Sequence, residues 1–181
     1  MKYYMAPMEG LTGYIYRNAY HHHFAQMDKY FAPFIVASSN RKMNHREMND
    51  LRPEHNRDLV LIPQILANKA DDFLTTASNL WEMGYEEINL NLGCPSKTVV
   101  SKYKGSGFLE KTVELEKFLD RILNKMNGVL SVKTRIGRYE ADEFYTLMNI
   151  FNKFPLEELI IHPRVQTDYY ENTPDMDAFQ M

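Results

Sequence analysis

Short apolar stretches alternate along the chain with longer stretches in which apolar residues recur at helical spacing. The short stretches predict β-strands over residues 3–5, 30–36, 59–66, 87–92, 129–134 and 159–162. The longer stretches predict helices over residues 12–26, 70–83, 112–126 and 142–154. Strands that alternate with helices at a spacing of about 30 residues are typical of parallel strands joined by helical crossovers.

Several residues mark where these elements begin, end or are interrupted. Thr12 is a favourable N-cap for the first helix, and Gly84 is a typical C-cap for the second. Pro63 interrupts the strand over residues 59–66, because proline has no N–H to donate to a neighbouring strand. The polar residues 38–58 predict a loop with a short helix.

Two architectures fit this alternation, an open doubly wound sheet and a (β/α)8 barrel. No GxGxxG follows the first strand, which argues against a dinucleotide-binding sheet. A barrel places its chemistry at the carboxyl ends of several strands. Polar residues occur there at Glu9, Gln64, residues 91–94, residues 133–135 and residues 162–164. We therefore predict an α/β fold of the (β/α)8 TIM-barrel type, incomplete with six strands, since a whole barrel typically needs about 250 residues.

The composition narrows the class of protein. Of the 181 residues, 44% are apolar and 25% are charged, which is sufficient for a packed core. The single cysteine excludes an internal disulfide and a CxxC metal site. No apolar stretch approaches the length of a membrane span, and the amino terminus lacks the apolar core of a secretory signal. We expect a cytoplasmic protein without a membrane partner.

The net charge of −3 hides an uneven distribution. Residues 97–138 carry ten basic and four acidic residues, whereas residues 139–181 carry two and nine. A basic segment can gather an anionic ligand although the whole chain is slightly acidic. Lys97, Lys102 and Lys104 are the candidates, because they lie in a loop-like stretch without an acidic residue. The alternative is that these lysines only solvate a face of the protein.

Cys94 is the strongest candidate for a catalytic residue. It follows a predicted strand within the turn Asn91-Leu92-Gly93-Cys94-Pro95, where glycine permits unusual backbone angles and proline stiffens the exit. A thiol held in this way near a lysine can act as a nucleophile or as a proton donor. The alternative is an inert buried cysteine.

Lys133 lies within an apolar strand, so its side chain is expected to point into the barrel. A buried lysine needs an anion or an electron-rich partner, and it can stabilise negative charge that develops on a reduced ring. The alternative is a lysine at a strand end that reaches solvent. Arg135 is two residues further on and should face the same way.

Three further polar residues lie within, at the end of or just after predicted strands. The Gln64 amide can offer a donor and an acceptor to the edge of a heterocycle, unless it is satisfied by the backbone. His162 and Arg164 could hold polar and phosphate groups, unless they form a surface turn.

The run His21-His22-His23 suggests a metal site at first sight. Successive residues of a helix project about 100° apart, so three in a row cannot share one ion. We expect no metal site.

Taken together, six motifs resemble the tRNA-dihydrouridine synthases, which are FMN-dependent enzymes of the (β/α)8-barrel class. The motifs occur in the order typical of that family and span residues 5–170. They are Ala6-Pro7-Met8-Glu9-Gly10-Leu11-Thr12, Pro63-Gln64-Ile65-Leu66-Ala67-Asn68, Asn89-Leu90-Asn91-Leu92-Gly93-Cys94-Pro95, Lys97 with Gly105-Ser106-Gly107-Phe108-Leu109, Val132-Lys133-Thr134-Arg135-Ile136-Gly137, and Ile161-His162-Pro163-Arg164.

The resemblance implies that a uridine of tRNA is flipped into the barrel mouth and reduced to 5,6-dihydrouridine. FMN, reduced by NADPH or NADH, delivers a hydride to C6 of the uracil, and Cys94 delivers a proton to C5. The resemblance also implies the other roles. Flavin contacts are expected from Pro7, Met8, Gln64, Lys133, His162 and Arg164, and substrate contacts from Asn91, Arg135, Lys97, Lys102 and Lys104.

The chain departs from the family pattern in two ways. Gly13 and Asn89 stand where the family has Asp, Pro163 replaces a usual Gly, and Gly107 replaces a usual Ala. The glycine-rich turns of the seventh and eighth strands and the helical tRNA-binding domain are missing, and residues 175–181 read as the start of the sixth barrel helix. Residues 1–181 are therefore expected to be the N-terminal part of an FMN-binding catalytic barrel that binds FMN poorly and is inactive alone.

Two alternatives remain open from the sequence. One is an FMN-dependent barrel that acts on a small molecule, similar to dihydroorotate dehydrogenase. The other is a non-catalytic fragment that binds RNA or self-associates through open barrel edges.

Overall fold

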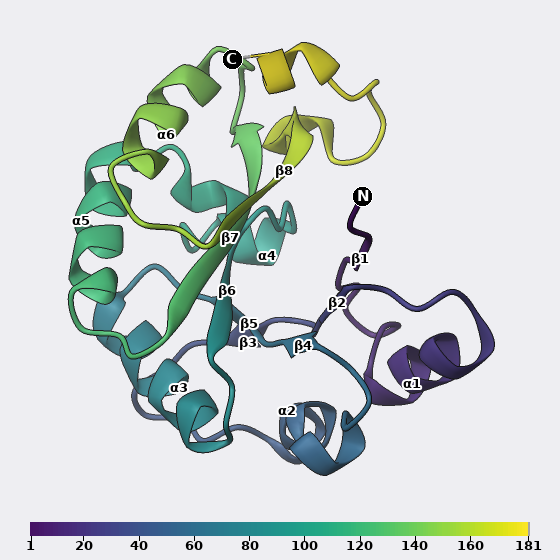
Figure 1. Ribbon diagram of the computed structural model, residues 1–181. Coiled ribbons are helices and arrows are strands. Elements are labelled where there is room, and N and C mark those ends of the chain that lie inside the picture. Colours follow the sequence, from purple (N-terminus) through teal and green to yellow (C-terminus); the bar gives the residue numbers. More distant parts are fainter. Residues whose placement is uncertain (181) are drawn as a thin grey trace.

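The computed structural model describes residues 1–180, in which parallel strands are surrounded by helices (Figure 1). The strands form two ladders, in the orders β1-β2-β4 and β3-β5-β6-β7-β8. Their bounds are β1 (Tyr4–Met5), β2 (Lys29–Phe31), β3 (Ile35–Val36), β4 (Leu61–Ile62), β5 (Gln64–Leu66), β6 (Glu87–Leu92), β7 (Val129–Gly137) and β8 (Glu158–Val165).

Two of the predicted strands are each divided in two by a proline. Pro33 separates β2 from β3, and Pro63 separates β4 from β5. Proline has no N–H, so the ladder is interrupted where each proline stands. The pairing nevertheless continues, because β2 pairs with β4 and β3 pairs with β5. The predicted strands over residues 30–36 and 59–66 therefore lie where the sequence placed them, but each consists of two short strands instead of one.

The order of the strands decides between the two architectures. Counting β2 with β3 and β4 with β5, six strand positions follow one another in chain order, and every pair is parallel. A doubly wound sheet would reverse its order at a switch point. The incomplete (β/α)8 barrel predicted from the sequence is confirmed.

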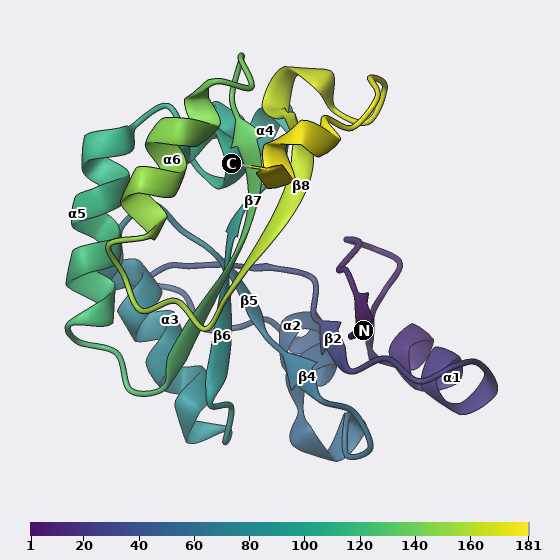
Figure 2. The same ribbon diagram turned by 45° about the horizontal axis from the view of Figure 1, so that its top comes forward.

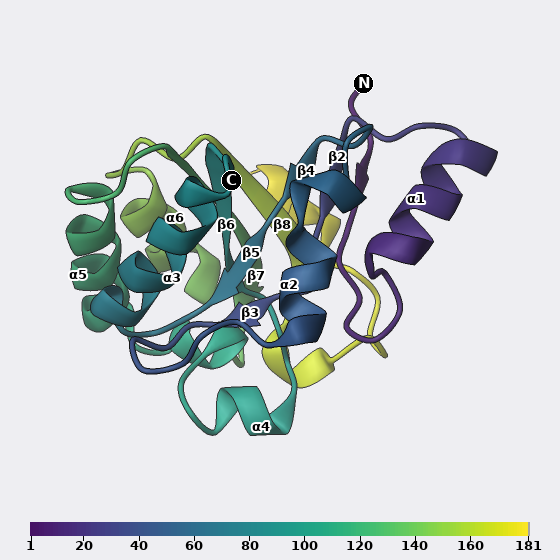
Figure 3. The same ribbon diagram turned by 90° about the horizontal axis from the view of Figure 1, so that it is seen from below.

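The helices lie outside the strands, as expected for a barrel. Figures 1 and 2 show α3, α5 and α6 side by side along β6, β7 and β8, and Figure 3 shows α1 on the opposite side of the molecule from α5. The helices are α1 (Tyr14–His23), α2 (His45–Leu51), α3 (Ala70–Glu82), α4 (Lys97–Val100), α5 (Thr112–Leu123) and α6 (Glu143–Phe151).

The helices α3 and α5 are anchored by the apolar faces predicted from their spacing. Phe73 of α3 and Phe118 of α5 meet edge to face with ring centroids 5.8 Å apart, and both are buried. Such an aromatic pair adds about 0.5–1.5 kcal/mol to the stabilisation from burial alone.

Several predicted helix boundaries were wrong. The N-cap of α1 is Gly13, because the Thr12 hydroxyl accepts a hydrogen bond from the Met8 N–H at 2.7 Å instead. The helices α1, α5 and α6 end at His23, Leu123 and Phe151, each three residues before the predicted end. The expected start of a sixth barrel helix is a 3-10 helix over Met176–Gln180, and Met181 lies outside the described residues.

A polar cluster at the amino ends of the strands joins the two edge strands. The Tyr4 hydroxyl of β1 donates to Glu158 of β8 at 2.7 Å. Lys29 of β2 donates to Glu87 of β6 at 2.8 Å and to Glu158 at 3.3 Å. The six strands therefore curve far enough for β1 and β8 to meet through side chains. Within residues 1–180, no helix is long and apolar enough to cross a membrane.

Candidate functional site

A cavity of about 400 Å³ opens at the carboxyl ends of the strands, and this volume lies in the usual range for small-ligand sites. It collects residues from β5, β6, β7 and β8 and from the loops after β1 and β2. They are Ala6, Pro7, Met8, Glu9, Pro33, Phe34, Gln64, Asn91, Gly93, Cys94, Pro95, Lys133, His162 and Tyr170. Barrel enzymes place their chemistry at this end, so we call this cavity the site pocket.

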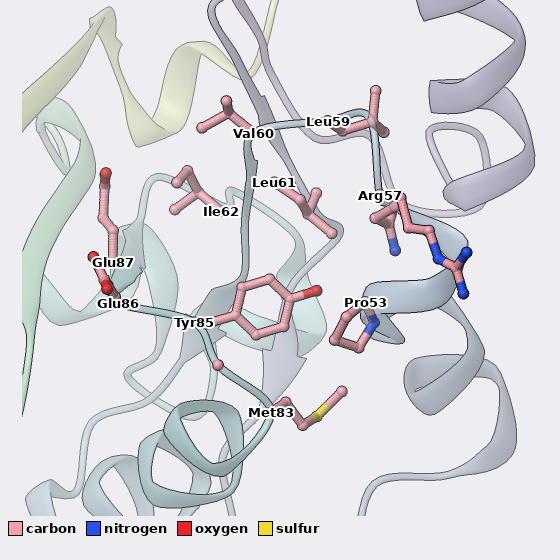
Figure 4. Close-up of a pocket in the computed structure, with 12 residues that line it drawn as sticks. Pro53, Arg57, Leu59, Val60, Leu61, Ile62, Met83, Tyr85, Glu86 and Glu87 are labelled. Carbon is pink, nitrogen blue, oxygen red and sulfur yellow. The ribbon is translucent and has the colours of Figure 1, made fainter.

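A larger hollow of about 540 Å³ lies at the amino ends of β4 and β6 (Figure 4). Its walls include apolar side chains such as Leu61, Ile62 and Met83, and it contains none of the predicted site residues. Its Tyr85 hydroxyl donates to the Leu51 carbonyl at 2.5 Å, and burial raises the pKa of Tyr85 to about 12. The larger hollow is therefore remote from the predicted chemistry, and volume alone does not identify the site.

The site pocket brings together seven of the twelve predicted site residues. Those that line it are Pro7, Met8, Gln64, Asn91, Cys94, Lys133 and His162. Those that do not are Arg135, Arg164, Lys97, Lys102 and Lys104. The roles of all twelve remain predictions.

The backbone of Cys94 is held on both sides. The N–H groups of Gly93 and Cys94 both donate to Asn91 Oδ1, at 3.0 and 2.9 Å. The Cys94 carbonyl accepts the Ser106 hydroxyl at 2.8 Å. Gly105 permits this approach, because its φ is +55° and a Cβ there would lie 2.8 Å from the Cys94 carbonyl oxygen. The structure therefore contains the rigid turn around Cys94 that the sequence predicts.

Burial raises the pKa of the Cys94 thiol above its ordinary value. The N–H of Ser96 and the charge of Arg135 oppose this shift without cancelling it, and Glu9 adds to it. The thiol is therefore neutral near pH 7 and carries a proton that it can give away. This state suits a proton donor better than a nucleophile.

Lys133 lines the site pocket from β7, as its place in an apolar strand predicted. No hydrogen bond or ion pair joins its ammonium group to another of residues 1–180. Burial lowers the pKa of Lys133, and the nearby charge of Arg135 lowers it further. A half-buried amine without an acidic partner is costly, so the group is available to an electron-rich ligand.

Arg135 is fully buried and is held by backbone carbonyls rather than by the site pocket. Its guanidinium donates to the carbonyls of Gly93 at 2.9 Å, Val165 at 2.8 Å and Tyr169 at 2.7 Å. It therefore ties the loop after β6 to the segment after β8. Its side chain does not line the pocket beside Lys133, although strand periodicity predicts that the two face the same way.

His162 is a neutral hydrogen-bond donor at the rim of β8. Arg164 donates to His162 Nε2 at 3.0 Å, so the proton of the neutral ring lies on Nδ1. Burial lowers the pKa of His162 to about 4, and the charges of Arg135, Lys133 and Arg164 act in the same direction. Arg164 itself also donates to the Asn172 carbonyl at 2.5 Å.

This shift gives a direct prediction. In an NMR titration of the ring carbons, His162 should change charge at about pH 4 instead of its ordinary value of 6.5. The variant Arg164→Gln should move the midpoint upward, because one repelling charge is removed. The unfolded chain binds this proton more readily, so the protein should lose stability as the pH falls from 6.5 to about 4. A midpoint near 6.5 in the folded protein would contradict the burial of this ring.

The sequence did not single out Tyr170. Its ring stacks on His162 with centroids 5.9 Å apart, and the Arg135 guanidinium lies 5.3 Å from its centre. It lines the site pocket although its side chain is 69% exposed. In the sequence, Tyr170 is marked only by its place in the loop after the sixth strand position. The chain has many tyrosines, so this place did not distinguish it.

The three predicted lysines lie on the segment that follows Cys94. Lys97 begins α4 and is exposed, and Lys102 is also exposed. Lys104 is half-buried, and its pKa is lowered by burial and by the charges of Lys102 and Lys69, against the effect of Asp72. We call these three lysines the basic surface, and none of them lines the site pocket.

An open barrel of parallel strands with its pocket at their carboxyl ends defines the (β/α)8-barrel class. The family model described as "Dihydrouridine synthase (Dus)" matches residues 4–180. The chain belongs to the dihydrouridine synthase family, which confirms the resemblance seen in the motifs.

Curated relatives agree with this assignment. The chain is 29% identical over 169 residues to a "Probable tRNA-dihydrouridine synthase" of Staphylococcus aureus (strain COL), with 91% of this chain and 50% of that protein covered. It is 27% identical over 177 residues to "tRNA-dihydrouridine synthase B" of Pasteurella multocida (strain Pm70), with 96% and 52% covered. The chain thus spans about half the length of the curated relatives it matches.

Proposed function

We propose that this chain forms the flavin-binding and proton-donating part of an enzyme that reduces uridine in tRNA to 5,6-dihydrouridine, with NADPH or NADH as the reductant. Its family membership supports this reaction. The observation that carries the proposal is the pairing, in one pocket, of the unpartnered Lys133 ammonium with the neutral Cys94 thiol.

The polar groups of the site pocket fit the isoalloxazine ring and phosphate of FMN. Lys133 and His162 both face the pocket as hydrogen-bond donors, and a flavin ring carries carbonyl oxygens and ring nitrogens that accept. We propose that Lys133, His162 and Gln64 hold the ring, that Pro7 and Met8 form an apolar wall, and that Arg164 contributes to phosphate binding. The bound flavin supplies the hydride that reaches C6 of the uracil.

Cys94 supplies the second half of the reduction. Hydride addition at C6 breaks the C5=C6 π-bond and places an electron pair on C5. The thiol gives its proton to C5 as the new C–H bond forms, and the thiolate left behind recovers a proton from water. A raised thiol pKa keeps Cys94 protonated until that step. We propose that Asn91 aligns the uracil, whereas Arg135, the second candidate from the sequence, is buried outside the pocket and is excluded from this role.

The basic surface supports tRNA as the partner. Lys97, Lys102 and Lys104 lie within ten residues of Cys94 along the chain, which favours a bound phosphate backbone near the pocket mouth. Such contacts supply affinity that falls with salt. Flipping a base out of its stack costs a few kcal/mol, which these contacts help to offset.

We propose that two further strand positions, between β8 and β1, complete the barrel, and that this chain alone binds FMN weakly and has no turnover. The flavin absorbance that co-purifies with the protein tests this. We expect little flavin on the 181-residue chain. We expect stoichiometric flavin on a completed barrel, in which this chain is joined to the part of the Staphylococcus aureus relative that lies beyond the match. Tight binding by the chain alone would overturn the weak-binding proposal, and no flavin on either protein would overturn the flavin site.

A further inference from the structure

Tyr103 has a backbone conformation that is unusual for its residue type. Its φ is +50°, in the left-handed region that favours glycine. The cause lies in how the chain leaves α4. The Lys104 N–H donates to the Val99 carbonyl at 3.2 Å, and the Tyr103 N–H donates to the carbonyl of Val100 at 2.9 Å. This pair of bonds is a Schellman motif, whose left-handed position is usually occupied by glycine. A tyrosine in that position is strained.

Burial does not compensate for this strain. Tyr103 is 45% exposed. The Lys111 ammonium lies 4.7 Å from the centre of its ring, and free ring area remains beside that contact. Strained residues that the surrounding fold does not require cluster where a protein contacts a ligand. The exposed ring is therefore a candidate contact for a partner molecule.

The surroundings of the ring are basic. Lys102 and Lys104 flank Tyr103 along the chain. Burial lowers the pKa of Lys104, and the charges of Lys102 and Lys69 lower it further, against the effect of Asp72. The Lys104 ammonium therefore lies close to two others, and an anionic partner would relieve the repulsion between them.

Lys111 adds a further ammonium group at the ring. Its carboxylate partner is Glu110, at 3.7 Å, and Glu110 also accepts a hydrogen bond from Arg138. One carboxylate is thus shared by two cations, so positive charge is left over. We call Tyr103 and the lysines around it the tyrosine platform. Its members are Tyr103, Lys102, Lys104 and Lys111.

The segment that carries Tyr103 is tied to the cysteine turn at both ends. It begins at Ser96, two residues after Cys94. At its far end, Ser106 donates to the Cys94 carbonyl through its N–H at 3.2 Å and through its hydroxyl at 2.8 Å. Three residues of chain span at most about 11 Å, so the Tyr103 backbone lies within that distance of Ser106. Figure 3 shows α4, which precedes Tyr103, at the margin of the molecule.

An exposed ring among ammonium groups fits the chemistry of an unpaired nucleotide. Every base has a π-face that can stack on an aromatic ring, and its phosphates pair with ammonium groups. The bases of a duplex are already stacked on one another, whereas those of a loop can be splayed out onto a protein ring. The tyrosine platform therefore favours a looped part of an RNA.

We propose that the tyrosine platform binds an unpaired nucleotide of the tRNA, with the base stacked on the Tyr103 ring and the adjacent phosphates bound by the lysines. This contact rests on the proposed tRNA substrate and lies outside the site pocket. It would hold the tRNA close to the turn that carries the proposed proton donor.

Tyr103→Gly separates this role from a structural one, because its two expected effects have opposite signs. Glycine suits the left-handed position, so the melting temperature should not fall. The loss of one stacked base should raise the dissociation constant of unmodified tRNA about tenfold. Tyr103→Asn, which also suits this conformation, is a second disruptive variant. Tyr103→Phe keeps the ring and should bind as the unmodified protein does. Tyr145→Leu removes another exposed tyrosine, on α6, and should change nothing.

The readout is the binding of fluorescently labelled tRNA transcript, measured at several salt concentrations with the 181-residue chain and with the completed barrel. A stacked base releases no counterions, so Tyr103→Gly should leave the salt dependence of binding unchanged. Lys102→Gln should instead lower the slope of log affinity against log salt by about 0.7–0.9, the value for one phosphate contact.

Unchanged tRNA affinity in both Tyr103→Gly and Tyr103→Asn would overturn the inference. Weaker binding together with a lower melting temperature in both variants would also overturn it, because the ring would then serve the fold. If neither unmodified protein bound tRNA, the inference and the proposed tRNA substrate would fail together. Weaker binding by the Tyr103 variants with no dihydrouridine formed by the unmodified completed barrel would support the tyrosine platform and contradict the proposed reaction alone.

Discussion

Replacing Cys94 by alanine should lower dihydrouridine formation by the completed barrel about 10²–10⁴-fold, which is the usual contribution of a positioned proton donor. The thiol lines the site pocket, and its raised pKa keeps the proton on sulfur. Flavin content and flavin reduction by NADPH should not change, because neither step uses the thiol. Dihydrouridine is measured by mass spectrometry of digested tRNA.

Ser96→Ala is the matched control, because Ser96 is exposed in the same turn and its backbone N–H survives the substitution. It should retain the full rate. If Cys94→Ala also retained the full rate, Cys94 would not be the proton donor. If Cys94→Ala lost its flavin as well, the cysteine would be acting through cofactor binding instead.

Replacing Lys133 by methionine should have opposite effects on stability and on binding. A half-buried amine without a protein partner costs the unliganded fold about 1 kcal/mol, the lower end of the range for a fully buried group, so the free energy of unfolding should rise by about that amount in urea titrations. The flavin affinity of the completed barrel should fall about 10–100-fold, because a hydrogen bond from a charged group is lost.

The pH dependence of this effect has a definite sign. The pKa of Lys133 is lowered in the folded protein, so the unfolded chain binds the proton more tightly. The stability of the unmodified chain should therefore rise relative to Lys133→Met as the pH approaches the ordinary lysine value of 10.5. Lys117→Met, at an exposed position of α5, should change neither stability nor affinity. A destabilised Lys133→Met variant with normal flavin affinity would show that the lysine serves the fold.

The fold could be predicted from the sequence because the periodicity is local. Residues 87–92 form a strand with the predicted bounds, since every residue from Ile88 to Leu92 is buried. The breaks at Pro33 and Pro63 were harder to predict, because a proline without an N–H can either end a strand or only interrupt it. Which of these occurs depends on the neighbouring strand, which local sequence does not show.

The sequence predicted most of the residues that line the candidate site, but it did not predict their hydrogen-bond partners. Gln64 and Lys133, which lie within strands, and Cys94, which follows one, meet in one pocket as the sequence indicated. The partners of Arg135 could not be predicted, because backbone carbonyls of three separate segments converge on it only in the folded chain. The same holds for Gln64, whose amide is satisfied by two asparagine side chains rather than by the backbone.

The central claim is that this pocket reduces uridine in tRNA. The most direct measurement is the mass of the nucleosides released from unmodified tRNA after incubation with the completed barrel, FMN and NADPH. We predict that one or more uridines gain two hydrogens, and that free uridine under the same conditions gains none. Unchanged tRNA in the presence of flavin-loaded protein, or reduction of a free pyrimidine alone, would contradict the account.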